Sequence, residues 1–190
     1  GSDGELLVLA PVWSRRVCAR GVVPFPWLGF GELQDGVAER SRRSWAERRD
    51  DLVYWGGAAE APPQLDGDLE LLLKVGEDNE GGDFRFVLLR AGAAEDDELR
   101  RQLADPETLV FLAPSLRGFE RFYFAELRPL VHYVPVGADL ADLGEVARWA
   151  RGHEEVVREI ARRGARYARR HLGEGALLEH ARVVLEETVC

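Results

Sequence analysis

Short apolar runs separated by polar, glycine-rich or proline-rich stretches make up the first two thirds of the chain. The runs "ELLVLAPVW" (5–13), "DLVYWGG" (51–57) and "TLVFLAP" (108–114) have the length and the β-branched or aromatic content of strands. The segment Leu127–Val136, which holds "VHYVPV", predicts another buried strand. "LELLLKV" (69–75) fits either a strand or a short helix, because its periodicity favours neither.

Helical patterns lie between and after these runs. A helix is expected at residues 38–50. A second is expected in the charged segment "AEDDELRRQLADPET", where it should end before Pro106. "LRGFERFYFAELRPL" predicts a short helix that ends before Pro129. A further helix is expected to start near Asp139 or Asp142, since either aspartate is a good N-cap.

The last third of the chain is dominated by one apolar stripe at helical spacing. Its members are Val156, Val157, Ile160, Ala161, Gly164, Tyr167, Ala168 and Leu172. A final helix is expected at about residues 174–188. Because strands alternate with helices, the pattern predicts an α/β fold, with a Rossmann-like parallel sheet flanked by helices.

Composition and charge exclude several classes of protein. The 190 residues suit one domain, and the formal net charge of -9 is opposite to that of most nucleic-acid-binding proteins. No apolar run is long enough to span a membrane. The two cysteines, Cys18 and Cys190, form no zinc-binding pattern, and the sequence leaves open whether they pair. We therefore expect no metal, no cofactor, no nucleic-acid partner and no membrane span in this chain.

The C-terminal pattern resembles that of glycosyltransferase family 90, which contains the Rumi-type protein O-glucosyltransferases and the capsule-associated xylosyltransferases. The family reads "L-x-P-W-x-H-Y-x-P-V", then an acidic "D-L" helix start, then "I-A-x-x-G-x-x-F/Y-A-x-x-x-L". The matching positions here are Pro129, His132, Tyr133, Pro135, Val136, Asp139, Leu140, Ile160, Ala161, Gly164, Tyr167 and Leu172, whereas Leu130 stands where tryptophan is usual. Upstream, "APVWS", "VVPFPWLGFGEL" and "WAERRDDLVYWGGAA" are similar to family segments more weakly.

Residues 1–190 are accordingly interpreted as one family 90-like domain that corresponds to the C-terminal half of a full member, in divergent form. We divide it into a partial N-terminal segment (1–57), a variable linker and insert (58–107) and a donor-binding part (108–190). The resemblance implies the nucleotide-sugar half of a GT-B glycosyltransferase, which places the donor at the carboxyl ends of parallel strands. It also implies an inverting, metal-independent enzyme of the endoplasmic reticulum or Golgi lumen. Such an enzyme transfers glucose or xylose from a UDP-sugar to a hydroxyl of a protein or glycan acceptor.

The resemblance suggests site residues, with departures. Arg85 falls on a nucleotide-binding arginine in "DFRF", with Phe84, Asp83 and Gly57 beside it in the nucleotide-sugar site. Asp83 replaces a serine, however, and Gly56 stands where the family has an arginine for the diphosphate. Phe25 and Trp27 are candidates for the acceptor side. Asp3 is a candidate catalytic base, although the family's aspartate motif is missing before "APVWS".

Each candidate also has a purely structural interpretation. Arg85 fits a surface arginine beside a turn, and His132 and Tyr133 fit packing residues with the imidazole bonded to the backbone. The aromatic residues of 22–31 fit closure of the core. A degenerate, non-catalytic relative or a fragment that acts as a binding or structural domain therefore stands as the alternative function.

Overall fold

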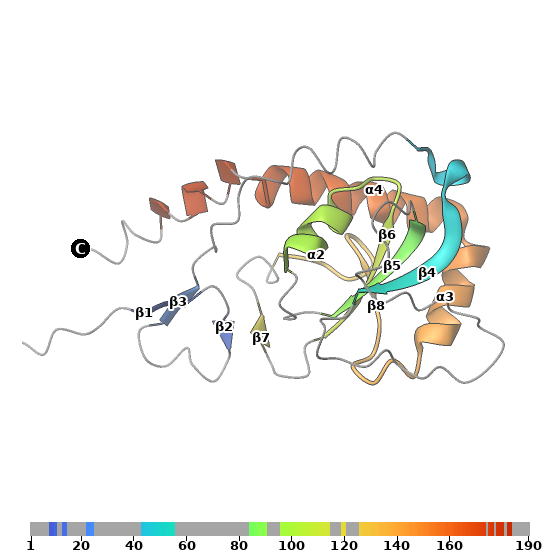
Figure 1. The fold of residues 1–190 in the computed structure, drawn as a ribbon, viewed down its shortest axis with the longest axis horizontal. Coiled ribbons are helices and arrows are strands. Elements are labelled where there is room, and N and C mark those ends of the chain that lie inside the picture. Colours follow the sequence, from blue (N-terminus) through green and yellow to red (C-terminus); the bar gives the residue numbers. More distant parts are fainter. Residues whose placement is uncertain are drawn as a thin grey trace, which may run out of the picture.

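The computed structural model describes residues 43–55, 84–90, 96–114 and 126–173, with shorter pieces at 8–10, 13–14, 22–24, 119–120, 175–176, 178–180 and 182–183. Its centre is a four-stranded parallel sheet (Figure 1). The order is β4-β5-β6-β8, formed by β4 (Arg49–Trp55), β5 (Phe84–Arg90), β6 (Leu109–Ala113) and β8 (Val134–Pro135). The predicted strands at 51–57 and 108–114 are thus confirmed.

Within the described ranges, three α-helices flank this sheet. Helix α2 (Asp96–Leu103) connects β5 to β6, while α3 (Leu143–Gly152) and α4 (Glu154–His171) follow β8. Helices α2 and α3 lie on opposite sides of the sheet in Figure 1. The fold is therefore α/β, with a parallel sheet flanked by helices, as the sequence predicted. Two small pairs lie apart from it in the hydrogen-bonding pattern: β1 (Val8–Ala10) with β3 (Val22–Pro24), and β2 (Trp13–Ser14) with β7 (Phe119–Glu120).

The sheet is buried on both faces, which explains why its strands read as nearly continuous apolar runs. Phe86, Leu88 and Phe111 belong to one buried cluster, whereas Val87 and Leu89 belong to the other. Because neighbouring side chains on a strand point to opposite faces, consecutive apolar residues must fill two cores. Figure 1 shows the helices that supply the other half of each core.

Helix α4 contributes to both cores. Val157, Ile160 and Ala161 join the first cluster, and Tyr167 and Leu172 join the second. The predicted stripe is therefore confirmed as a buried surface. Its exception is Val156, which is 50% exposed.

The expected helix at 38–50 is wrong for the part of it that the structure describes. Only one 3-10 turn, η1 (Trp45–Glu47), forms before β4 begins at Arg49. Its Ser44 amide donates to the Glu47 carboxylate at 2.8 Å, which closes a single turn. Arg85 then donates to the carbonyl oxygens of Trp45 and Ala46, the acceptors that a continuing helix needs.

The expected strand Leu127–Val136 is also largely wrong, because only Val134–Pro135 pairs with β6. Before it the chain turns: the Leu130 amide donates to Tyr133 O at 2.8 Å, and Leu130 has φ 59° and an exposure of 56%. The described parts of the expected helix before Pro129 are not helical either, since 119–120 form β7. The described residues among 174–188 are helical, in agreement with the expected final helix.

Candidate functional site

All four strands of the sheet run in the same direction, so it has two chemically different edges. The strands begin at Arg49, Phe84, Leu109 and Val134, which define the amino edge. They end at Trp55, Arg90, Ala113 and Pro135, which define the carboxyl edge. Ligands of open parallel sheets bind beyond the carboxyl ends of the strands, so the carboxyl edge is the candidate site.

A compact turn follows β8 at the carboxyl edge, and we call residues 137–142 the carboxyl-edge loop. The Gly137 amide donates to Asp142 Oδ1 at 2.8 Å, and the Ala141 amide donates to Asp139 Oδ1 at 3.2 Å. A Cβ on Gly137 would lie 3.0 Å from Asp139 Oδ1, so a larger residue there would crowd the loop. Helix α3 begins directly after the loop, with Asp142 as N-cap residue, as expected. Its carboxylate bonds Gly137 rather than the helix amides, so the expected capping bond is replaced by one that closes the loop.

Leu140 fixes this loop to the core. Its side chain is buried in the first cluster, yet its backbone has φ 60°. A non-glycine residue in the left-handed region costs roughly 1–2 kcal/mol. Such strained positions cluster at ligand sites, where the surrounding structure holds them. The loop is therefore held in one conformation before any ligand arrives.

Arg90, the last residue of β5, reaches this loop. Its Nη1 donates to the carbonyl oxygen of Ala138 at 2.9 Å. Arg90 is paired with Ala113 in β6, and β8 lies beyond β6, so the side chain crosses the carboxyl end of β6. This bond joins three strands at the carboxyl edge and places a guanidinium group there.

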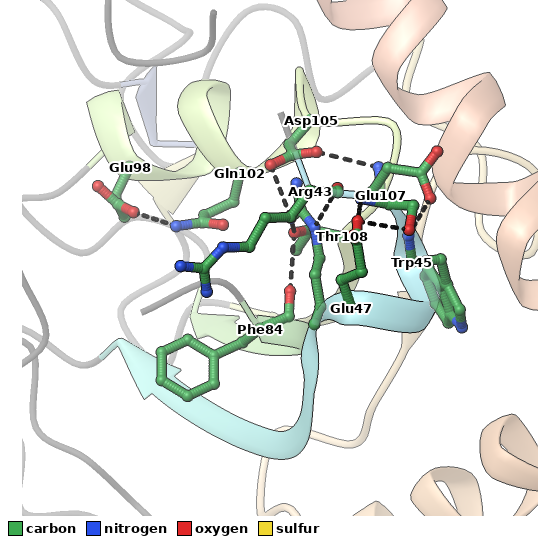
Figure 2. Close-up of polar contacts among 11 residues, drawn as sticks. Arg43, Trp45, Glu47, Phe84, Glu98, Gln102, Asp105, Glu107 and Thr108 are labelled. Carbon is green, nitrogen blue, oxygen red and sulfur yellow. Dashed lines mark hydrogen bonds and ion pairs between the residues drawn. The ribbon is translucent and has the colours of Figure 1, made fainter. Parts of the chain in front are cut away.

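The amino edge is occupied by a buried polar network (Figure 2). Arg48 donates from Nη1 to Asp105 Oδ2 at 2.8 Å and to Thr108 Oγ1 at 2.7 Å, and both partners of the ion pair are almost fully buried. The Thr108 hydroxyl donates to Phe84 O, and the Trp45 amide donates to the Glu107 carboxylate. The network connects the start of β4 to the turn between α2 and β6. Its role is therefore to stabilise the fold.

Arg85 and Phe84, two residues predicted for the nucleotide-sugar site, lie at this amino edge. Arg85 Nε donates to Trp45 O at 2.7 Å, and its Nη1 lies 3.5 Å from the Asp50 carboxylate. Phe84 is buried, with the Arg49 guanidinium 5.3 Å above its ring. These contacts hold η1 against β5, at the end of the sheet opposite to the carboxyl edge. The assignment of Arg85 to phosphate stays a prediction.

The remaining predicted site residues lie outside the described part of the chain. They are Asp3, Asp83, Gly57, Phe25 and Trp27. Among the described residues, no group of three or more His, Cys, Asp or Glu could hold a metal ion. The same residues contain no helix long and apolar enough to cross a membrane.

His132 has the packing role that the structural interpretation predicted. The Arg128 amide donates to His132 Nδ1 at 3.1 Å, and the imidazole stacks on the Tyr167 ring at 4.8 Å between centroids. Burial lowers the pKa of His132, and the positive charges of Arg128, His171 and Arg163 lower it further. Burial also raises the pKa of Tyr167 to about 12, helped by the Glu126 charge. The His132 imidazole is therefore harder to protonate than a free one, and it lies in a stack with the Tyr167 ring.

The sequence did not indicate the contact between Arg90 and the carboxyl-edge loop. A signal for the position of Arg90 was present, because it ends an apolar run that is followed by glycine at position 92. An arginine at the carboxyl end of an expected parallel strand is a natural candidate for an anionic ligand. The resemblance drew attention instead to the arginine at the start of the same strand.

Comparison with known proteins matches part of the chain, including the carboxyl-edge loop, to a protein family. Residues 106–187 match the model of glycosyl transferase family 90. The match contains β6, the carboxyl-edge loop, α3 and α4. The resemblance to this family is thus confirmed for the C-terminal part of the chain.

Individual relatives agree with that match. Over 66 residues the chain is 44% identical to protein O-glucosyltransferase 2 of Danio rerio, and over 51 residues it is 39% identical to protein O-glucosyltransferase 1 of Homo sapiens. These alignments cover 35% and 27% of this chain, and 13% of each relative. An uncharacterized protein, 035R of Invertebrate iridescent virus 3, is 31% identical over 97 residues, which is 51% of this chain and 9% of that protein. The chain therefore matches only a small part of each relative.

Proposed function

We propose that this chain carries the donor-binding part of a glycosyltransferase that moves glucose or xylose from a UDP-sugar to a hydroxyl of a protein or glycan. The observation that carries the proposal is the family 90 match over residues 106–187. The relatives named protein O-glucosyltransferase support glycosyl transfer in general. The parallel sheet adds the physical reason, because its carboxyl edge is where such sheets bind nucleotides.

The proposed reaction is an inverting displacement that needs no metal. An acceptor hydroxyl oxygen forms a bond to the anomeric carbon of the sugar, while the bond from that carbon to the diphosphate breaks. UDP leaves with the electron pair, so positive or hydrogen-bonding groups must hold its developing charge. The acceptor proton passes to a base, for which Asp3 is the candidate in this chain.

The carboxyl-edge loop suits the donor because it is preformed. A ligand that binds a rigid site spends less of its interaction energy on ordering the protein. The Gly137–Asp142 bond and the buried side chain of Leu140 supply that rigidity. We place the nucleotide against this loop, and the acceptor on residues upstream, where Phe25 and Trp27 are the candidates. On the basis of the same resemblance, we propose that the protein acts in the lumen of the secretory pathway.

The alternative is a relative that keeps the fold and has lost the reaction. It is favoured by Gly56, which stands in place of the family's diphosphate arginine, and by Asp83 in place of a serine. Both proposals predict the same sheet, and they differ in whether UDP binds.

Titration calorimetry with UDP separates the two. An active donor site is expected to bind UDP with a Kd in the micromolar range, about -8 kcal/mol, and to bind ADP at least tenfold more weakly. Release of UDP from UDP-glucose or UDP-xylose in the presence of an acceptor then tests transfer. A protein that folds, as judged by its melting transition, and binds neither nucleotide would favour the non-catalytic alternative.

A further inference from the structure

One exposed surface of the protein combines an apolar side chain with several arginines, and it lies away from the candidate donor site. The turn at residues 128–132 precedes β8, so it lies at the amino edge of the sheet. Leu130 in this turn is 56% exposed. We call this turn and the neighbouring exposed side chains of α4 the basic surface. Its exposed residues are Arg128, Pro129, Leu130, Arg163, Arg166 and Arg170.

Helix α4 brings its arginines next to the turn. The His132 imidazole stacks on the Tyr167 ring, with 4.8 Å between centroids, and a Cβ on Gly164 would overlap the His132 carbonyl oxygen. Arg163 precedes Tyr167 by four residues and Arg170 follows it by three, so both lie on the face of α4 that carries Tyr167. The apolar turn and the basic helix face therefore form one continuous surface.

The arginines of the basic surface are only partly balanced by acids. Glu159 accepts from Arg163 at 2.9 Å and from Arg166 at 3.2 Å, so one carboxylate serves two guanidinium groups. Within the described residues, neither Arg128 nor Arg170 forms an ion pair. This part of the protein thus has positive charge to spare, although the whole chain carries a formal net charge of -9.

The surroundings of His132 reflect the same excess of positive charge. Burial lowers the pKa of this imidazole, and three nearby cations lower it further, namely Arg128, His171 and Arg163. The acid that acts on the stack is Glu126, whose charge adds to burial in raising the pKa of Tyr167. Glu126 and Glu159 together are fewer than the arginines they face.

The total charge of the chain favours a narrow anionic partner over a membrane. A protein of net charge -9 is repelled as a whole by an extended anionic surface. Screening limits electrostatic attraction to about 8 Å in physiological salt, so a peptide on the basic surface meets its arginines and little else. One exposed leucine also buries less apolar area than stable membrane anchoring needs. Carboxylates fit the surface because a guanidinium group binds them bidentately.

We infer that the basic surface binds an acidic segment of a partner protein. Carboxylates of the partner pair with Arg128 and Arg170, and an apolar side chain of the partner packs on Leu130. The turn is preformed, because the Leu130 amide donates to Tyr133 O at 2.8 Å, so binding spends little on ordering it. The surface lies at the amino edge, and the inference therefore does not depend on the proposed donor site.

The test uses two short fluorescent peptides, one with glutamates on both sides of a leucine and one with glutamines in their place. Fluorescence anisotropy gives the Kd for wild type and for Arg128→Gln/Arg170→Gln. The matched control is Arg162→Gln/Arg169→Gln, which removes the same charge from exposed positions. Arg169 follows Tyr167 by two residues, so it lies on the opposite side of α4.

Wild type is expected to bind the glutamate peptide at least tenfold more tightly than the glutamine peptide, with an affinity that falls as salt is added. Arg128→Gln/Arg170→Gln should weaken the glutamate peptide by about tenfold, and the control by less than about threefold. Leu130→Asn should weaken it by about three- to tenfold, because the apolar contact is lost. Asparagine tolerates the positive φ at this position, so the turn should be kept.

Each other outcome contradicts the inference. A wild-type protein that does not bind the glutamate peptide would overturn it. Equal losses in the two double variants would also overturn it, since the attraction would then be unspecific. Sedimentation with phosphatidylserine vesicles, without binding of the peptide, would assign the surface to lipid instead. Melting temperatures show whether each variant folds, and Arg170→Gln against Arg169→Gln decides if a double variant does not. Failure to bind UDP would affect the proposed function alone.

Discussion

Gly164 of α4 lies directly against the backbone of His132. A Cβ at position 164 would overlap the His132 carbonyl oxygen and would lie 3.1 Å from Leu103 Cδ1. Helix α4 passes the turn before β8 at this point, on its way from the first core to the second. The glycine is what lets the helix come close enough to serve both cores.

Gly164→Ala is therefore expected to lower the free energy of unfolding by about 1–3 kcal/mol, since a backbone oxygen cannot move aside as a flexible side chain can. The loss should appear although alanine is the better helix former by about 1 kcal/mol. Thermal unfolding followed by circular dichroism measures it. Gly152→Ala is the matched control, because nothing lies within 4 Å of a Cβ at that position. Equal melting temperatures for the two variants would contradict the close approach.

The buried ion pair between Arg48 and Asp105 gives a second prediction. Asp105→Ala should cost about 3–5 kcal/mol of stability, because it leaves the Arg48 charge buried without its partner. The double variant Arg48→Met/Asp105→Leu should recover part of that loss, since both charges are then removed. Denaturant unfolding of the two variants makes the comparison.

A surface pair serves as the control for this buried one. Arg163 and Glu159 form an ion pair on α4 with both side chains more than 40% exposed. Glu159→Ala should destabilise the protein far less than Asp105→Ala does, because water screens exposed charges. A loss for Asp105→Ala as small as that for Glu159→Ala would refute the structural role of the amino-edge network.

Much of the fold was predictable because its signals are local. The run "TLVFLAP" is apolar at every position that faces either core, so it predicts a strand with two buried faces. The helix that contains Ile160 and Tyr167 was predictable because one stripe recurs along it at helical spacing. Such patterns arise from the burial of each side chain and need no knowledge of its partners.

The predictions were wrong where contacts between residues far apart in the sequence determine the conformation of the backbone. The turn at Leu130 depends on a positive φ and on a bond between Leu130 and Tyr133, which an apolar run does not indicate. The single turn at Trp45 depends on Arg85, which lies 40 residues away in sequence. The bond from Arg90 to Ala138 O was hidden for the same reason, since Ala138 follows β8 and β6 lies between β8 and the strand that ends at Arg90.

The stack around His132 predicts how stability depends on pH. Burial lowers the pKa of folded His132 below the usual 6.5, so the unfolded chain binds a proton more readily than the folded protein does. The contribution of His132 to the free energy of unfolding should accordingly be constant above about pH 7 and should fall as the pH drops through about 6.5 towards the folded pKa.

His132→Phe tests this dependence, because it keeps a ring against Tyr167 and removes the titrating group. Its free energy of unfolding should fall less than that of wild type between pH 7.5 and about 5, as measured by urea unfolding at each pH. His180, whose pKa is also lowered by burial, contributes the same dependence in both proteins and cancels. Identical pH profiles for the two proteins would exclude His132 as the source.

Two β-branched residues on α4 test its packing against the sheet. Ile160 is 4% exposed in the first core, whereas Val156, one turn earlier, is 50% exposed. Ile160→Ala should lower the free energy of unfolding by about 2–5 kcal/mol, as core truncations do. Val156→Ala should change it by less than about 0.5 kcal/mol. Thermal melts of both variants that shift by the same amount would refute the orientation of the helix.

Arg85 has two interpretations that an experiment can separate: it holds η1 against β5, or it binds the phosphate of the donor. Its bonds to Trp45 O and Ala46 O hold η1 in place, so Arg85→Gln is expected to lower the free energy of unfolding by about 1–3 kcal/mol. If Arg85 also binds phosphate, the same variant must weaken UDP by about tenfold or more, since 1.4 kcal/mol corresponds to a factor of ten.

Calorimetry with UDP, at a temperature where both proteins are folded, separates these effects. We expect a lower melting temperature and a UDP Kd within about threefold of wild type, because the Arg85 guanidinium lies at the amino edge with Asp50 beside it. A tenfold rise in the UDP Kd would instead return Arg85 to the donor site. Gly56→Arg adds the complementary measurement. It should strengthen UDP binding if the lost arginine is all that weakens the diphosphate site, and an unchanged Kd would show that this substitution alone does not limit the affinity for UDP.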